Sequence, residues 1–282
     1  MQSILQESTS HSTPWYTDDP RPTHLTPDIC GFFEEYSGIQ GAEIAALVLK
    51  VREKAWHIRP YPCIGSFAFL DFCLRDLPNY AALLRLLKTG GRKFVDLGCC
   101  FGQNMRWLAK DGVSPDAMIG VDLLPDFWDL SFDMFKDRDK MGSRLIVGDV
   151  LHDGQCKELG ELERNVDVVF AGNLFHLFGW DDQVKVATRA VQWSRGPGSI
   201  ICGEMIGMVE ARSKLSGWGE SGTTHFWQDE KSWRILWEKV EGITGTAWDV
   251  WTHSVRTSEL GDCYSYMGDS TTKMRFVCTR NS

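Results

Sequence analysis

From Lys93 onward, short apolar runs alternate with amphipathic stretches. Five runs rich in β-branched residues predict buried strands, at 93–97, 118–122, 144–148, 166–171 and 199–203. Apolar residues at helical spacing predict helices at 103–111, 125–136, 156–162, 181–195 and 229–241. Strands that are apolar throughout belong to a parallel sheet covered on both faces. Two later strand-like runs, 246–254 and 273–280, complete a seven-stranded, mostly parallel, Rossmann-like α/β sheet.

The pattern before Lys93 has a different character. Its first residues are polar and rich in Ser, Thr, Pro and Asp, as is typical of a flexible arm. Helical spacing follows at 39–57 and 66–87, interrupted by a run with two prolines and closed by Gly90-Gly91. We therefore divide the chain into an arm (1–27), an N-terminal helical lid (28–91) and a core (92–282) with a Gly/Ser/Thr-rich insertion (208–226).

Composition and charge argue against several classes of protein. A net charge of −8, with no Lys/Arg-rich stripe, argues against a nucleic-acid substrate. The chain has no apolar run long enough to span a membrane, and its first residues lack the features of a signal peptide. None of the nine cysteines forms a Cys-x-x-Cys pair, so we expect free thiols, a cytoplasmic location and no metal site. Monomer and homodimer stay open.

Tryptophan is unusually frequent, with 12 residues, eight of which lie in the C-terminal half. Some must belong to the core. Such a surplus also suits a pocket for a bulky apolar molecule, so we expect a hydrophobic small molecule as the partner.

The most informative motif is the turn Asp96-x-Gly98-x-x-x-Gly102, which follows the first predicted strand and precedes a helix. The dinucleotide fingerprint needs a middle glycine, where a pyrophosphate approaches the backbone, and Cys100 occupies that place here. S-adenosylmethionine (SAM) has no phosphate and fits better, with Asp96 positioning its methionine amino group. The alternative is a glycine-rich turn that binds nothing.

Two further acidic residues end the next two strands. Asp122 is placed to accept both ribose hydroxyls, or instead to cap the helix that begins at Pro125. Asp149 and its neighbours are placed to meet the adenine amino group. Ligands of open α/β sheets bind at the carboxyl ends of the strands, so the three acids together predict a SAM site.

The fourth strand ends near the expected methionine end of the cofactor. Asn173 and His176 follow it and are candidates for the reacting centre. The segment lacks the Asn/Asp-Pro-Pro-aromatic tetrad of amino-directed nucleic-acid methylases, and no cluster of acids suits Mg²⁺. His176 is alternatively a partly buried histidine bonded to a carbonyl group.

Two longer runs are far more specific than the glycine motif, namely Tyr61-Pro62-Cys63-Ile64-Gly65 and Asp96-Leu97-Gly98-Cys99-Cys100-Phe101-Gly102-Gln103. With them the chain resembles class I SAM-dependent methyltransferases. Within that class it is similar to the fungal enzymes of meroterpenoid biosynthesis that methylate the carboxyl group of a prenylated aromatic polyketide acid. The resemblance covers nearly all of residues 28–280.

The resemblance implies a cofactor site and a lid that brings Tyr61 to the cofactor or the substrate. With the strand-end argument, the predicted cofactor residues are Asp96, Gly98, Gly102, Asp122, Leu123, Asp149, Val150 and Asn173. Glu204, after the fifth strand, departs from expectation, because an acidic side chain facing the pocket would disfavour a carboxylate substrate.

Three functions stay open at this point. A carboxylic acid is already ionised at neutral pH, so its methylation needs positioning more than a base, and Arg59, Tyr61 or His176 would orient it. A phenol would need a general base, for which His176 is the candidate. The third function is a SAM-fold protein that binds a partner without catalysis.

Overall fold

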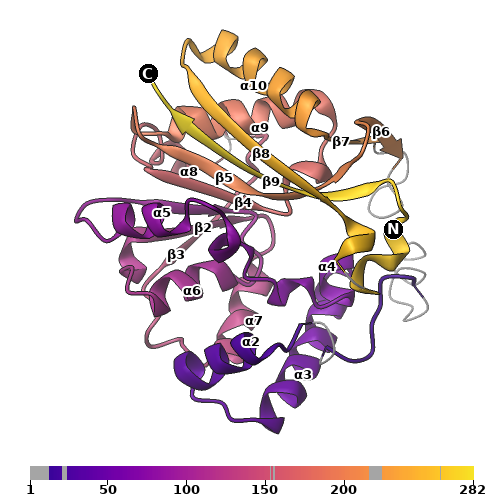
Figure 1. The fold of residues 1–282 in the computed structure, drawn as a ribbon. Coiled ribbons are helices and arrows are strands. Elements are labelled where there is room, and N and C mark those ends of the chain that lie inside the picture. The colour runs from indigo at the N-terminus through magenta and orange to yellow at the C-terminus, as the bar shows by residue number, and fades with distance from the viewer. Residues whose placement is uncertain (1–12, 21–23, 153, 155, 216–223, 261) are drawn as a thin grey trace.

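The computed structural model describes residues 13–20, 24–152, 154, 156–215, 224–260 and 262–282, and it contains one seven-stranded sheet (Figure 1). The strand order is β3-β2-β1-β4-β5-β9-β8. The first five strands are parallel, whereas β9 pairs antiparallel with both β5 and β8. The bounds are β1 Phe94–Leu97, β2 Met118–Asp122, β3 Arg144–Val147, β4 Val168–Gly172, β5 Ile200–Met208, β8 Trp248–Arg256 and β9 Thr271–Arg280. The predicted mostly parallel sheet is confirmed.

Helices cover both faces of this sheet, as predicted (Figure 1). One face packs against α5 (Tyr80–Leu87), α6 (Gln103–Lys110) and, through Trp128, α7 (Pro125–Phe135). The opposite face packs against α8 (Lys157–Gly160), α9 (Trp180–Trp193) and α10 (Glu230–Thr244). The order reverses between β1 and β4, which leaves the crevice where α/β proteins bind their ligands.

The fifth strand is longer than the sequence predicts. It runs to Met208, because β9 pairs with it along its whole length. Part of the predicted insertion 208–226 forms a separate hairpin of β6 (Arg212–Leu215) and β7 (Thr224–Trp227). Trp218 lies outside the described residues.

The N-terminal region contains α2 (Pro27–Phe32), a π-helical turn (Phe33–Ser37), α3 (Ala42–Ile58) and the short α4 (Pro62–Gly65). The continuous helix predicted at 66–87 is wrong. Phe67 takes a left-handed φ of 61°, and Leu77 is extended before Pro78, so the chain forms two 3₁₀ turns before α5. The domain division stays a prediction; α5, which it assigns to the lid, packs on the sheet in one cluster with Cys73 and Leu74.

The described part of the predicted flexible arm is attached to α3 and α4. The Tyr16 hydroxyl donates to Glu53 at 2.6 Å, and Thr17 N donates to the Gly65 carbonyl at 3.0 Å. Arg52 donates to the Thr17 carbonyl at 2.8 Å. These contacts make residues 13–20 a packed part of the lid, whereas residues 1–12 and 21–23 lie outside the described part of the chain.

Candidate cofactor and acceptor site

The turn after β1 has a backbone shape that needs its glycines. Gly98 and Gly102 have φ values of 74° and 58°, in the left-handed region. A Cβ at Gly98 would lie 2.9 Å from Leu174, and one at Gly102 would lie 2.8 Å from Trp128. Cys100 is also left-handed, with φ of 48°, and its N–H donates to Asp122 Oδ2 at 2.8 Å. This bond helps hold a non-glycine residue in a conformation that costs energy.

Asp122 connects the turn to the end of β2. Its second oxygen, Oδ1, accepts from Leu124 N at 3.0 Å. The proposed helix cap is not observed, because no side chain caps α7. Burial raises the pKa of Asp122 even though backbone N–H groups donate to it. The backbone N–H groups of Cys100, Leu123 and Leu124 do not fill the roughly four acceptor positions of a carboxylate, so Asp122 can still accept from a ribose hydroxyl.

Asp96 is the least satisfied group at the site. The residue is only 3% exposed, and its carboxyl makes no hydrogen bond to any described residue. Burial raises its pKa to about 8, and the nearby Asp122 adds to the shift. A buried carboxyl without a partner is costly unless a ligand supplies one. The ammonium group of SAM is such a partner, so the residues present fit this cofactor.

This burial leads to a pH-dependent prediction. Below about pH 8 Asp96 is mostly protonated, and it must lose that proton to pair with the ligand's ammonium group. We expect the affinity for S-adenosylhomocysteine to rise up to about tenfold per pH unit between about pH 6 and 8, with release of about one proton. Titration calorimetry in buffers of different ionisation enthalpy measures this release. An affinity independent of pH would contradict the prediction.

The other predicted cofactor residues follow β2, β3 and β4, so they lie at the same edge of the sheet. Asp149 accepts from Leu151 N at 2.9 Å and pairs with His152 at 2.8 Å, and Val150 is buried beside it. Leu123 is 59% exposed at the end of β2. Asn173 has φ of 55°, and its N–H donates to the Glu204 carbonyl. Their roles toward the cofactor stay predictions.

The three predicted catalytic side chains are not gathered in one place. The Arg59 guanidinium lies 5.8 Å from the Tyr61 ring centre, and Tyr61 contacts Phe127 near the glycine turn. Burial raises the pKa of Tyr61, so its hydroxyl stays protonated at neutral pH. No described contact joins this pair to His176.

His176 is buried between β5 and β7. Its Nδ1 accepts a long hydrogen bond, 3.4 Å, from Ile206 N. This differs from the bond to a carbonyl group that the sequence analysis considered for His176. Burial, together with His225, lowers its pKa to about 3. The imidazole is therefore neutral at neutral pH and a weak proton acceptor.

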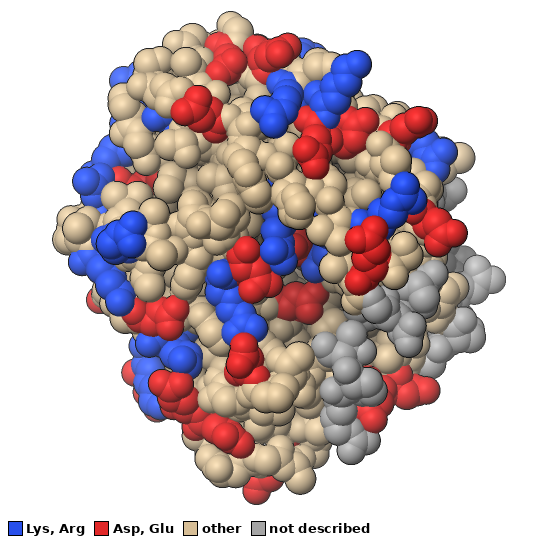
Figure 2. All heavy atoms as spheres, in the orientation of Figure 1, with Lys and Arg blue, Asp and Glu red and all other residues tan. Residues whose placement is uncertain are grey.

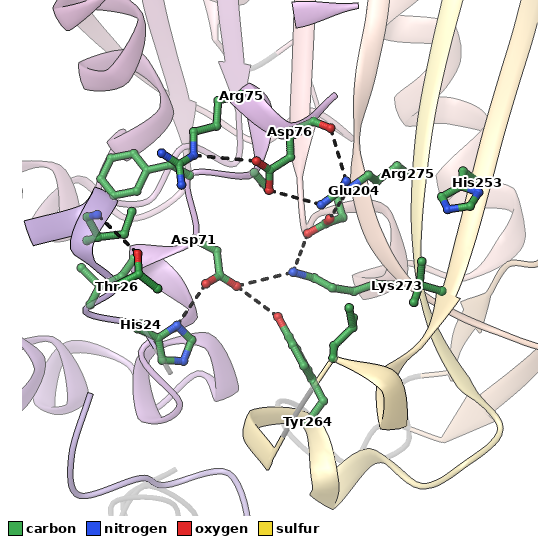
Figure 3. Close-up of a pocket in the computed structure, with 16 residues that line it drawn as sticks. His24, Thr26, Asp71, Arg75, Asp76, Glu204, His253, Tyr264, Lys273 and Arg275 are labelled. Atoms are coloured by element: carbon green, nitrogen blue, oxygen red, sulfur yellow. Dashed lines mark hydrogen bonds and ion pairs between the residues drawn. The ribbon is translucent and has the colours of Figure 1, made fainter. Parts of the chain in front are cut away.

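A cavity of about 340 Å³ lies between the lid, the strands β5 and β9, and the loop that joins β8 to β9 (Figure 3). Acidic and basic groups gather around a hollow on the face shown in Figure 2. The apolar lining comes from Ile29, Leu70, Phe72, Cys73, Val255 and Leu260, and the polar lining from His24, Thr26, Asp71, Arg75, Asp76, Glu204, His253, Tyr264, Lys273 and Arg275. Arg59, Tyr61 and His176 are not among the lining residues.

Glu204 does line this cavity, but its charge is matched. Lys273 Nζ lies 2.7 Å from Oε1, and Arg275 Nε lies 3.0 Å from Oε2. From the sequence, Glu204 was expected to disfavour a carboxylate substrate. Because both of its oxygens are paired with cations, a carboxylate in the cavity would not meet an unpaired negative charge.

Asp71 is the second centre of the polar lining. It accepts from His24 Nδ1 and from the Tyr264 hydroxyl, each at 3.0 Å, and Lys273 lies 3.5 Å away (Figure 3). Burial acts to raise the pKa of Asp71, but Lys273 and His24 outweigh it and lower the pKa to about 2. The network connects the arm, the lid and the C-terminal strands through charged contacts.

No tryptophan of the described residues lines this cavity, so a tryptophan-rich substrate pocket stays a prediction. Trp56, Trp193 and Trp233 are fully buried, whereas Trp237, Trp248 and Trp251 line a second pocket beside α10 and β8. Sequence reasoning missed Lys273 and Arg275. Their one available signal was a pair of positive charges two residues apart in the predicted strand 273–280, where they share a face.

Within the residues that the structure describes, no helix is long and apolar enough to cross a membrane. In the same part of the chain, no group of three or more His, Cys, Asp or Glu side chains is placed to hold a metal ion.

Comparisons with known proteins agree with this architecture. A family model for a meroterpenoid methyltransferase N-terminal domain matches residues 15–70, and one for a methyltransferase domain matches residues 95–202. O-methyltransferase phiE from a fungal species is 38% identical over 250 residues, which cover 87% of this chain and 80% of that protein. Asnovolin E/Chermesin D methyltransferase nvfJ from Aspergillus novofumigatus is 36% identical over 217 residues, 76% of each chain.

Among solved structures, the chain is similar to 1,6-didemethyltoxoflavin-N1-methyltransferase from Burkholderia thailandensis, solved with its acceptor and S-adenosylhomocysteine. The TM-score is 0.53 at 14% identity, covering 86% of this chain and 92% of that one. At this identity the likeness shows the fold alone.

Proposed function

Because this chain belongs to the fungal meroterpenoid methyltransferases, which are class I SAM-dependent enzymes, we propose that it forms a methyl ester on the carboxyl group of a prenylated aromatic acid. Membership establishes a SAM-dependent methyltransferase that methylates oxygen in fungal secondary metabolism. It also excludes the third function, a SAM-fold protein that binds a partner without catalysing a reaction. The carboxyl group and the prenylated acid are the parts that we propose.

The proposed reaction needs little from the protein beyond binding and orientation. When bound at the strand ends, SAM supplies a methyl group on a sulfonium centre; an acceptor oxygen forms the new C–O bond as the S–C bond breaks, and the electron pair stays on sulfur. A carboxylic acid with pKa near ~4 arrives ionised, so no proton has to be removed. Positioning and exclusion of water are then the main contributions of the chain.

One observation favours the acid over the phenol. His176, the base that phenol methylation would use, has its pKa lowered to about 3 by burial. A phenol has a pKa near ~10, so proton transfer to such a base would be strongly uphill. His176 is also absent from the cavity lining.

A His176→Gln variant tests this argument. Glutamine can still accept the bond from Ile206 N, so we expect kcat/KM for the acid to stay within about threefold of the wild type. Loss of a general base would instead lower kcat by about 10²–10⁴-fold. Steady-state kinetics, with SAM binding measured in parallel, distinguishes the two results.

The direct test of the proposed function uses the full chain with SAM and a panel of prenylated dihydroxybenzoic acids. We expect a product that is heavier by one CH₂ and that mild alkali converts back to the acid, as a methyl ester requires. The matching decarboxylated phenols serve as controls and should give no product. Methylated phenols, or no product from any acid, would contradict the proposal.

A further inference from the structure

We propose that Lys273 holds the carboxylate of the acceptor in the cavity between the lid and strands β5 and β9. This inference rests on the proposed carboxyl methylation and adds the residue that recognises the acid. Neither Arg59 nor His176, the candidates from the sequence, lines this cavity.

The cavity lies beside the expected methionine end of the cofactor. Gly172, at the end of β4, pairs with Glu204 on β5, and the next residue, Asn173, donates its N–H to the Glu204 carbonyl. Cys73 lines the cavity next to Gly172, and the charges of both Lys273 and Asp96 act on the pKa of its thiol. An acceptor in this cavity would therefore be close to the group expected to bind the cofactor's amino group.

Lys273 is the cation of the lining that can change partners without leaving a charge unpaired. Its ammonium group has three N–H donors, and its contact to Asp71 is long at 3.5 Å. If this contact moves to a ligand, Asp71 keeps His24 and Tyr264, each at 3.0 Å. Glu204 keeps Arg275 at 3.0 Å.

The two arginines of the lining are less suited than Lys273 to bind the carboxylate of the acceptor. Arg275 donates from Nε to Glu204 and from its terminal nitrogens to the carbonyl and carboxylate of Asp76. Arg75 lies over the Trp107 ring at 4.2 Å, with carboxylates of Asp28 and Asp76 at 3.6 and 3.7 Å. Both guanidinium groups are therefore committed to structural contacts.

The charge of the whole lining also fits an anionic acceptor. Three carboxylates (Asp71, Asp76 and Glu204) balance three cations (Arg75, Lys273 and Arg275). The negative charge of an acceptor acid is then offset by the sulfonium of the cofactor, so the assembled site is close to neutral. The apolar lining, which includes Ile29, Leu70 and Phe72, would contact the hydrocarbon part of the acid.

The test compares an acid with its own methyl ester in the presence of S-adenosylhomocysteine. The probes are farnesylated dihydroxybenzoic acid and its methyl ester, and calorimetry measures both affinities in the full chain. We expect Lys273→Met to weaken binding of the acid by about tenfold to a hundredfold and to leave binding of the ester unchanged, because only the acid has a negative charge that pairs with Lys273. Lys273→Arg should restore most of the acid affinity.

Two further variants separate recognition from folding. Lys185→Met makes the same change at an exposed ion pair on α9 and should alter neither affinity. Glu204→Gln keeps an acceptor for Lys273 and Arg275 but removes a competing anion, so acid binding should become tighter while ester binding does not. Equal losses for acid and ester in Lys273→Met, or weaker acid binding in Glu204→Gln, would overturn the inference.

The outcome is distinguishable from failure of the proposed function. If the wild type methylates no acid of the panel, carboxyl methylation is wrong whatever the Lys273 variants do. If the wild type forms the ester and Lys273→Met binds the acid as well as the wild type does, the proposed function stands and the role of Lys273 is wrong.

Discussion

Asp96→Asn is expected to weaken the binding of S-adenosylhomocysteine by about a hundredfold or more. Asp96 is buried and makes no hydrogen bond to any described residue, so a ligand ammonium group would be its ionic partner. Removing one member of a buried, hydrogen-bonded charge pair costs about 2–5 kcal/mol. The amide has the same shape but no charge, so packing around it should be preserved. Isothermal titration calorimetry near pH 8 measures the loss.

The matched control for this prediction is Asp149→Asn, the same substitution at the third strand-end acid. Asp149 has a 36% exposed side chain and a histidine partner at 2.8 Å, so water screens its charge. We expect a loss of about tenfold or less there. In the calorimetric pH series, Asp96→Asn should also abolish proton release. An Asp96→Asn protein that binds with wild-type affinity would show that this carboxyl does not meet the cofactor.

Arg106→Met is expected to produce the largest loss of stability. Arg106 and Asp137 are fully buried and joined by two hydrogen bonds, of 2.9 and 3.2 Å. Methionine fills similar space but leaves the Asp137 carboxylate without its cation. Breaking a buried pair in this way costs about 3–5 kcal/mol. For a chain of this size that lowers Tm by roughly 10 °C, measured by circular dichroism or calorimetry.

The same arginine also connects the core pair to the cofactor turn. Its Nη1 donates to the Phe101 carbonyl at 2.7 Å and makes a longer bond, 3.4 Å, to the Gly102 carbonyl. Asp137 in turn accepts from the Tyr36 hydroxyl of the lid at 2.9 Å. We therefore expect weaker cofactor binding in Arg106→Met even at temperatures where the protein remains folded.

Arg144→Met provides the control for stability. Arg144 pairs with Glu161 at 3.1 Å, and both side chains are 49% exposed. An exposed ion pair contributes about 0–1 kcal/mol, so Tm should change by only a few degrees. If Arg106→Met and Arg144→Met lowered Tm equally, burial of the Arg106 pair would not be the cause of its importance.

The cofactor edge of the fold was accessible from sequence because its determinants are local. Asp96 lies one residue before the end of β1, Asp122 ends β2 and Asp149 follows β3 closely, while Gly98 and Gly102 flank one turn. Parallel strands then bring such positions together without further information. Errors arose where partners are distant. β5 was predicted too short because its last residues are ordered by pairing with β9. The helix predicted at 66–87 failed at Phe67, whose left-handed backbone no periodicity signals.

The acceptor cavity shows the opposite case. His24, Asp71, Glu204, Tyr264 and Lys273 meet there, and the bond from Tyr264 to Asp71 spans 193 positions of sequence. No spacing rule connects such residues, because packing of the lid against the C-terminal strands creates their contacts. Burial likewise gave His176 a low pKa, which its position after β4 did not indicate.

The sequence by itself thus determined the sheet, the edge where the cofactor is expected and the three acids that lie there, since strand periodicity and local turn chemistry encode them. Only the tertiary structure decided that Glu204 is paired, that His176 is a weak base and that Lys273 reaches the cavity. Charge pairing, burial and cavity shape depend on contacts between distant segments, and these exist only once the chain has folded.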